Sequence, residues 1–229
     1  MTDVNRRQML GTAASLAATA SVTTAAVAAT KDAAPLAPAV PLPFPRASLG
    51  WLSERLITSH HDNNYVGAVK RLGQIRNELA GADLATMPGY RLNGLKREEL
   101  IAWNSMIIHE LYFAGLGKSA SAGAALSQAI ERDFGSHAGW AAEFAAMGKA
   151  LGGGSGWVLL TWSARDRRLV NQWAADHTMT LAGATPILAL DMYEHAYAID
   201  FGAKAGDYVD AFMKSIAWGN ADRLFKALA

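Results

Sequence analysis

The chain contains no cysteine, so histidine, aspartate and glutamate are the residues left to bind a metal ion. Disulfides, iron–sulfur clusters and thiolate metal sites are excluded for the same reason. Imidazole and carboxylate groups suit the first-row transition metals that carry out oxygen chemistry. The six histidines are therefore the first candidates for a metal site. They are His60, His61, His109, His137, His177 and His195.

One histidine lies close to a carboxylate in the sequence. Asp191 and His195 are four residues apart and directly follow an apolar run, while His60, His61 and His109 lie in two predicted helices. A set of three histidines and one aspartate would leave a coordination position for solvent or substrate. A simpler interpretation stays open for each residue. A histidine on a helix is more often a core or surface residue than a ligand, and an Asp–His pair at this spacing also forms local hydrogen bonds.

The hydrophobic pattern predicts the elements that carry the N-terminal histidines. Residues 51–79 have apolar side chains at helical spacing without proline, which predicts a long helix. Residues 80–95 contain glycine and proline breaks and predict a loop. A second long helix is predicted at residues 96–116. Two long helices joined by a loop predict an antiparallel helical hairpin.

The second half of the chain mixes short helices and strands. Helices are predicted at residues 121–132, 139–151 and 208–218. Strands rich in valine, leucine and tryptophan are predicted at residues 157–162, 168–173 and 187–190. We therefore predict an α+β fold, in which an N-terminal antiparallel helical hairpin precedes an α/β half with a small three-stranded antiparallel sheet. The two corresponding domains are predicted at residues 46–118 and 119–229.

The first 45 residues are predicted to lie outside the fold. Arg6 and Arg7 precede an apolar, alanine-rich stretch, so residues 1–29 resemble an export signal of the twin-arginine type, which carries folded proteins. Residues 30–45 form a Pro/Ala-rich lead-in. The apolar stretch contains Thr and Ser and is barely long enough to span a bilayer, so we expect no stable membrane insertion. We expect an exported, periplasmic protein; the alternative is an alanine-rich helix of the mature chain.

Composition excludes other classes of protein. Hydrophobic residues make up 51% of the chain and charged residues 18%, which predicts a folded globular protein. The formal net charge is +1. Binding to nucleic acid usually needs a strong basic excess, so we expect no nucleic-acid partner.

Five stretches, in the same order along the chain, resemble motifs of the iron/manganese superoxide dismutases. The strongest is Asp-Met-Tyr-Glu-His-Ala-Tyr at residues 191–197. It is similar to the family signature Asp-x-Trp-Glu-His-Ala-Tyr, with Tyr193 in place of the tryptophan. The other four stretches are residues 52–61, 109–113, 133–136 and 154–157. The resemblance extends from about residue 42 to the C-terminus.

This resemblance implies a metal site and a substrate. It implies one Fe or Mn ion per chain, held by His60 and His109 from the two long helices and by Asp191 and His195 from the C-terminal half. The substrate would be superoxide. The position of Ser105 usually helps to separate iron-type from manganese-type members, and serine matches neither choice, so the metal stays open.

The resemblance also implies roles around the metal. Trp157 would help to wall the site, and His177 falls where the family carries a Gln or His that hydrogen-bonds to the metal-bound solvent. A homodimer is implied, in which Glu194 reaches a ligand histidine of the partner subunit. We place Tyr197 in the same dimer bridge.

Two alignments of the first helix remain open. Without a gap, the tyrosine and histidine that line the family's substrate funnel fall on Ala68 and Asn64. An alternative alignment pairs them with Tyr65 and His61, but it puts Ile57 at the first ligand position unless a gap is introduced. We take Tyr65 and Asn64 as candidate residues of the funnel.

The sequence therefore predicts a superoxide dismutase that converts superoxide to O2 and H2O2 at a mononuclear Fe or Mn site. The alternative is an exported Fe- or Mn-binding protein on the same scaffold, with little or no dismutase activity.

Overall fold

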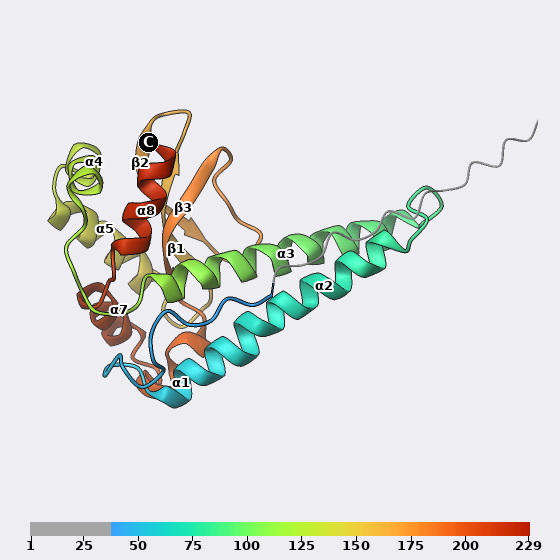
Figure 1. Ribbon diagram of the computed structural model, residues 1–229, viewed down its shortest axis with the longest axis horizontal. Coiled ribbons are helices and arrows are strands. Elements are labelled where there is room, and N and C mark those ends of the chain that lie inside the picture. Colours follow the sequence, from blue (N-terminus) through green and yellow to red (C-terminus); the bar gives the residue numbers. More distant parts are fainter. Residues whose placement is uncertain (1–37) are drawn as a thin grey trace, which may run out of the picture. The chain divides into compact units, whose positions relative to one another are not determined.

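The computed structural model of the protein describes residues 38–229 (Figure 1). The predicted export signal and the first part of the lead-in lie outside the described residues and stay predictions. The division into domains at residues 46–118 and 119–229 also stays a prediction. No helix within the described range is both long and apolar enough to cross a membrane.

The predicted helical hairpin is confirmed, with a local change of helix type in its first arm. This arm begins with α1 (Glu54–Ser59), continues through π-helical backbone at His60–Tyr65, and ends with α2 (Val66–Ala80). We call the segment His60–Tyr65 the π-turn. The Ser53 hydroxyl caps the arm by accepting a hydrogen bond from the Leu56 amide at 3.1 Å.

The second arm, α3 (Gly89–Ala114), begins seven residues before its predicted start at residue 96. The predicted loop is therefore wrong in its second half. Gly94 lies within the helix and is exposed, with no atom within 4 Å of its Cβ position. A helical glycine costs about 1 kcal/mol, and packing of α3 along α2 offsets this cost. The contact includes Leu72 and Ile75 of α2 and Ala102 of α3.

The predicted three-stranded antiparallel sheet is also confirmed. Its strands are β1 (Trp157–Ser163), β2 (Arg168–Ala174) and β3 (Ala184–Asp191), in the order β2-β1-β3. All seven residues of β1 are buried, because it is the central strand and helices pack against the sheet. The register pairs Trp157 with Asp191, which brings the end of β3 beside the start of β1.

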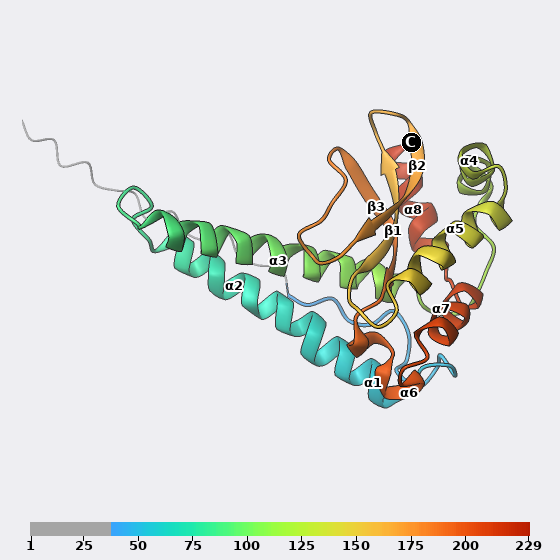
Figure 2. The same ribbon diagram turned by 180° about the vertical axis from the view of Figure 1, so that it is seen from behind.

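Helices pack against this sheet. α4 (Ala124–Phe134) contacts β2, and α5 (His137–Ala150) contacts β1. Ser136 is the N-cap of α5, and its hydroxyl accepts a hydrogen bond from the Gly139 amide. Serine is a preferred residue at this position. Helix α3 of the hairpin lies against β3, so the two halves of the fold meet there (Figure 2).

The C-terminal segment contains more breaks than predicted. After a 3-10 turn at Glu194–Ala196 come α6 (Ala198–Phe201), α7 (Ala205–Lys214) and α8 (Gly219–Leu228). The helix predicted at residues 208–218 is present as α7, but it ends at Lys214 and is not the last helix, because α8 follows it. The backbone after Lys214 pairs with the segment after α3, since the Ala217 amide donates to the Gly115 carbonyl at 2.8 Å.

Candidate metal centre

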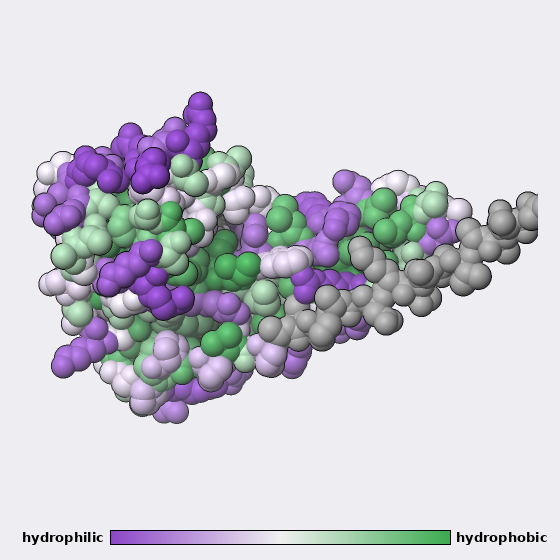
Figure 3. All heavy atoms as spheres, turned by 45° about the horizontal axis from the view of Figure 1, so that its top comes forward, coloured by the Kyte–Doolittle hydropathy of each residue, from purple (hydrophilic) through white to green (hydrophobic). Residues whose placement is uncertain are grey.

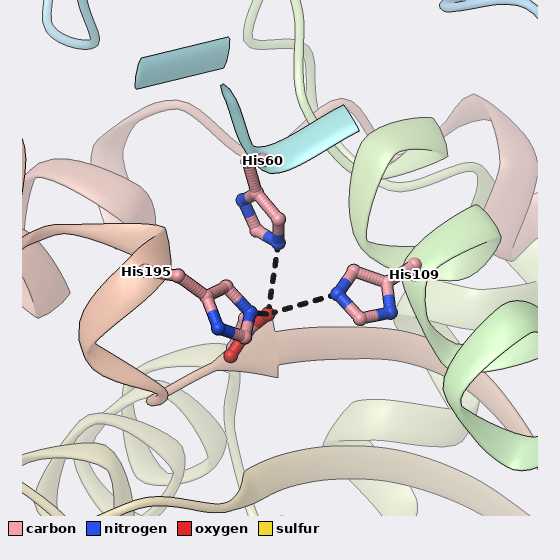
Figure 4. Close-up of side chains that lie close together, drawn as sticks. His60, His109 and His195 are labelled. Atoms are coloured by element: carbon pink, nitrogen blue, oxygen red, sulfur yellow. Dashed lines mark ion pairs between the residues drawn. The ribbon is translucent and has the colours of Figure 1, made fainter. Parts of the chain in front are cut away.

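Four side chains from four segments converge in the interior. His60 comes from the π-turn, His109 from α3, Asp191 from the end of β3, and His195 from the 3-10 turn. The Nε2 atoms of His60, His109 and His195 lie 3.1, 3.7 and 3.3 Å, respectively, from Asp191 Oδ2. Figure 4 shows the three imidazole rings aimed at one carboxylate oxygen. The structure thus brings together the four residues that the family resemblance implied.

The four facing atoms fit a bound cation. Each is buried and has no hydrogen-bond partner within residues 38–229. An unpaired buried polar atom costs about 1–3 kcal/mol, so four such atoms directed at one point indicate an ion between them. Metal ions bind imidazole nitrogen and carboxylate oxygen at about 2.0–2.2 Å, which puts neighbouring ligand atoms roughly 3–4 Å apart. Imidazole and carboxylate donors without sulfur suit Fe or Mn.

Burial sets the protonation of the centre. It lowers the pKa of His109 to about 3 and also lowers the pKa of His60, so both rings are neutral and can offer a lone pair. Burial alone would raise the pKa of the Asp191 carboxyl. The neighbouring His195 and His60 rings outweigh that effect and hold it below its usual range. The centre therefore presents the anionic Asp191 carboxylate and the neutral imidazoles of His60 and His109, which is the state in which these groups bind a metal ion.

Two of the four ligands are oriented by backbone groups. His109 Nδ1 donates to the Ser105 carbonyl oxygen at 2.6 Å, which leaves Nε2 free to face the centre. Asp191 Oδ1 accepts a hydrogen bond from the Tyr193 amide at 2.9 Å, which leaves Oδ2 facing the centre. The chain thus selects which atom of each side chain is presented.

Trp157, Tyr193 and His177 line one side of the centre. The buried Trp157 donates a hydrogen bond from Nε1 to His177 Nδ1 at 3.0 Å. The Tyr193 ring stacks on both His177 and His195, with centroid distances of 4.9 and 5.3 Å. His177 is therefore held in the wall of the centre, 6.0 Å from the His109 ring, rather than in a free loop. The stacking of Tyr193 had no signal in the sequence beyond its departure from the signature.

The π-turn relates the two alignments of the first helix. His60 occupies the ligand position, as the gap-free alignment required. Tyr65 and His61 are also buried beside the centre, as the alternative required: the Tyr65 ring lies 6.5 Å from His109, and His61 lies 5.6 Å from Phe113. The π-helical backbone at His60–Tyr65 therefore brings residues from both alignments close to the centre.

The remaining candidates from the first helix lie at its margin. Asn64 is half-buried, and Ala68 is buried among the apolar residues of α2. Neither belongs to the group of four donor atoms.

The two candidate bridge residues differ in exposure. Glu194 is exposed, and the neighbouring His195 side chain is 26% exposed, so the centre approaches the surface here. Tyr197 is only 2% exposed and stacks on Tyr208 at 5.3 Å. Its ring therefore packs within the subunit, and this placement offers no support for a bridge to a partner.

Acid should destabilise the metal-free protein. The folded-state pKa of His109 is about 3, against about 6.5 in the unfolded chain, so the unfolded state binds more protons between these values. Stability is therefore lost as the pH falls below about 6.5, by roughly 2 kcal/mol at pH 5 from this residue alone. Asp191 acts in the same direction at lower pH, because its folded pKa is depressed. Urea midpoints between pH 7.5 and 4.5 measure the effect; a midpoint that stays constant or rises in acid contradicts it.

A buried centre of three imidazoles and one carboxylate, held between a helical hairpin and an α+β half, defines a mononuclear metalloprotein. Residues 122–224 match the family model described as iron/manganese superoxide dismutases, C-terminal domain. The chain is 65% identical over 187 residues to a superoxide dismutase [Fe] of Cupriavidus metallidurans, covering 82% of this chain and 95% of that one.

More distant relatives carry names with either metal. A superoxide dismutase [Mn] of Haloarcula marismortui is 34% identical, covering 79% of this chain and 89% of the relative. A superoxide dismutase [Fe] of Aquifex pyrophilus is 32% identical, with 78% and 86% covered. The chain belongs to the iron/manganese superoxide dismutase family, as its motifs predicted.

Proposed function

We propose that this protein is a superoxide dismutase, converting two superoxide ions and two protons to O2 and H2O2. The observation that carries the proposal is the group of four buried, unpaired donor atoms of His60, His109, Asp191 and His195. One Fe or Mn ion binds there. We propose iron as the first choice, because the relative at 65% identity is named for iron.

The bound metal supplies the alternating one-electron oxidation and reduction of superoxide. The chain supplies the surroundings that this chemistry needs. Asp191 offsets the charge of the ion in a fully buried position, and the neutral rings of His60 and His109 bind it without added charge. The Trp157 indole occupies His177 Nδ1, so a neutral His177 carries its proton on Nε2 and presents a donor. We propose that this donor orients solvent and substrate at the centre.

Replacing Trp157 with phenylalanine tests the proposed role of His177. The indole donor is lost, so His177 is free to adopt either tautomer. We expect superoxide turnover per bound metal to fall about tenfold while metal content is kept. The matched control is Trp162→Phe, another buried tryptophan of β1, which packs on Phe225. Equal turnover in the two variants would refute the role.

The activity itself is tested by the rate of superoxide decay per bound metal, with the full chain loaded separately with Fe and with Mn. Fast decay with either metal supports the proposal and identifies the working ion. Full occupancy without catalysed decay would favour the alternative, a metal-binding protein on the same scaffold.

We propose that the chain forms a homodimer through the surface around Glu194. The centre is incompletely covered there, and the exposed residues Ala198 and Ile199 follow closely, Ile199 being 42% exposed. In the view of Figure 3, hydrophobic and hydrophilic residues are interspersed over the surface. Sedimentation of the full chain and of a Glu194→Ala variant tests this interface, since a monomeric wild type would exclude it.

We also propose export to the periplasm by the twin-arginine route. The support is the order of paired arginines, apolar stretch and small-residue cleavage motif in residues 1–29. Replacing Arg6 and Arg7 with lysine should leave the protein in the cytoplasm, as cell fractionation would show.

A further inference from the structure

Among the described residues, no hydrogen bond orients the ring of His60. Both of its ring nitrogens are buried and have no hydrogen-bond partner among the described residues. Its ring instead packs against Tyr112 and Phe113, with centroids 5.1 and 4.9 Å away. By contrast, His109 and Asp191 are oriented by hydrogen bonds to backbone groups. The position of His60 therefore depends on the backbone that carries it, the π-turn.

The lead-in contacts the π-turn through the backbone of Val40. The Val40 amide donates a hydrogen bond to the Tyr65 hydroxyl oxygen at 2.6 Å, and the Val40 carbonyl oxygen lies 3.2 Å from His61 Nε2. Both side chains are buried. Val40 of the lead-in is thus held through both its backbone amide and its carbonyl group, each by a different residue of the π-turn.

A second attachment to the π-turn comes from Arg46, the residue directly after the lead-in. Arg46 binds Asp62 through two parallel hydrogen bonds of 2.9 and 2.8 Å. Asp62 Oδ1 also lies 2.7 Å from His61 Nδ1, which links this ion pair to the first attachment. The pair is partly exposed, so its own contribution to stability is small. Its effect is to restrict where the π-turn can move.

The attachment also reaches the second ligand helix. The Tyr65 hydroxyl donates to Glu110 Oε1 at 2.9 Å, and Glu110 directly follows the ligand His109 on α3. The Tyr65 hydroxyl therefore joins the lead-in, the π-turn and α3 in one chain of hydrogen bonds. π-helical backbone is rare, and these hydrogen bonds stabilise it at His60–Tyr65.

We infer that the lead-in, Tyr65 and Glu110 form a clamp that holds the π-turn in place and thereby keeps His60 on the metal. Tyr65, Glu110, Asp62 and Arg46 are positioning residues, because they act on the metal through His60. The inference rests on the metal assignment of the proposed function, but not on its dismutase activity. It predicts that loosening the clamp speeds release of the metal.

The test uses the full chain loaded with iron and challenged with an excess of EDTA, with retained iron measured over time. We expect Tyr65→Phe to release iron about tenfold faster than the wild type and Arg46→Ala about threefold faster. The matched control is Arg91→Ala, which removes an exposed ion pair of 2.9 Å with Glu78 on the hairpin, away from the π-turn. This control should release iron at the wild-type rate.

Variants of Glu110 separate positioning from a general loss of stability. Glu110→Ala should release iron faster, whereas Glu110→Gln keeps an oxygen that accepts from Tyr65 and should restore slow release. The double variant Tyr65→Phe/Glu110→Ala should release iron no faster than Tyr65→Phe alone, because Tyr65 and Glu110 share one hydrogen bond.

Two results would contradict the clamp. Release from Tyr65→Phe and Arg46→Ala at the rate of Arg91→Ala would overturn the clamp. So would release rates that only follow the melting temperatures of the metal-free variants. Should Tyr65→Phe fail to fold, the partly exposed pair of Arg46 and Asp62 still decides the question. A chain that holds iron without dismuting superoxide would refute the proposed function and leave these release rates interpretable.

Discussion

Replacing Asp191 with alanine should leave the protein without a stably bound metal ion. Asp191 Oδ2 is the atom on which the three histidines converge, and the side chain is fully buried. Without it, the ion would be bound by neutral nitrogens only, in an interior where its charge is poorly solvated. We expect the metal content to fall at least tenfold and superoxide turnover per chain to fall by about two orders of magnitude. Metal analysis after desalting measures the first effect.

Asp133 provides a matched control for this prediction. Its carboxylate is also largely buried and accepts a hydrogen bond from the Leu169 amide at 2.7 Å, but it lies away from the centre. Asp133→Ala should lower stability and retain the metal. If Asp191→Ala kept near-stoichiometric metal, the assigned centre would be wrong.

Replacing Gly156 with alanine should cause the largest loss of stability among glycine-to-alanine changes in residues 38–229. Gly156 has φ of +139°, and a Cβ built there would lie 2.3 Å from the Ala174 carbonyl oxygen. The clash is with backbone, so no side chain can move to relieve it. The Gly156 carbonyl also accepts from the Met192 amide at 2.9 Å, which limits rotation of this peptide.

We expect Gly156→Ala to cost roughly 3 kcal/mol or more, because it combines an unfavourable φ with overpacking. The corresponding fall in melting temperature is about 10 °C for a chain of this size. Gly154→Ala is the control from the same motif: the nearest atom to its Cβ position is the Leu151 carbonyl oxygen at 3.5 Å, an ordinary contact. Thermal melts of both metal-free variants decide the matter, and equal melts would contradict the strain argument.

Local sequence patterns predicted the type and order of most elements. The apolar spacing of residues 51–79 predicted the first arm of the hairpin, and the Val-, Leu- and Trp-rich segments predicted β1 and β2 closely. Local signals were misleading where long-range packing decided the backbone. Gly94 indicated a break, yet it lies within α3. After α7 ends at Lys214, the Ala217 amide is hydrogen-bonded to the Gly115 carbonyl, a long-range contact that no local pattern indicated.

Composition and motif order specify which metal-binding groups this protein has available. Without cysteine, the chain offers only nitrogen and oxygen ligands, and motifs in the family's order identified His60, His109, Asp191 and His195 among them. Periodicity also predicted the two long helical arms that carry His60 and His109 and the strand that leads to Asp191, since helix and strand periodicity are local properties of the chain.

Which atom of each ligand faces the centre depends on the packing of the folded chain. The choice of Asp191 Oδ2 depends on the Tyr193 amide, and the choice of His109 Nε2 depends on the Ser105 carbonyl. The π-turn, and with it the placement of Tyr65 against Glu110 and Val40, depends on contacts between the lead-in, the first arm and α3. Each of these is a matter of ångströms between groups brought together by packing, and residue spacing along a chain does not specify such distances.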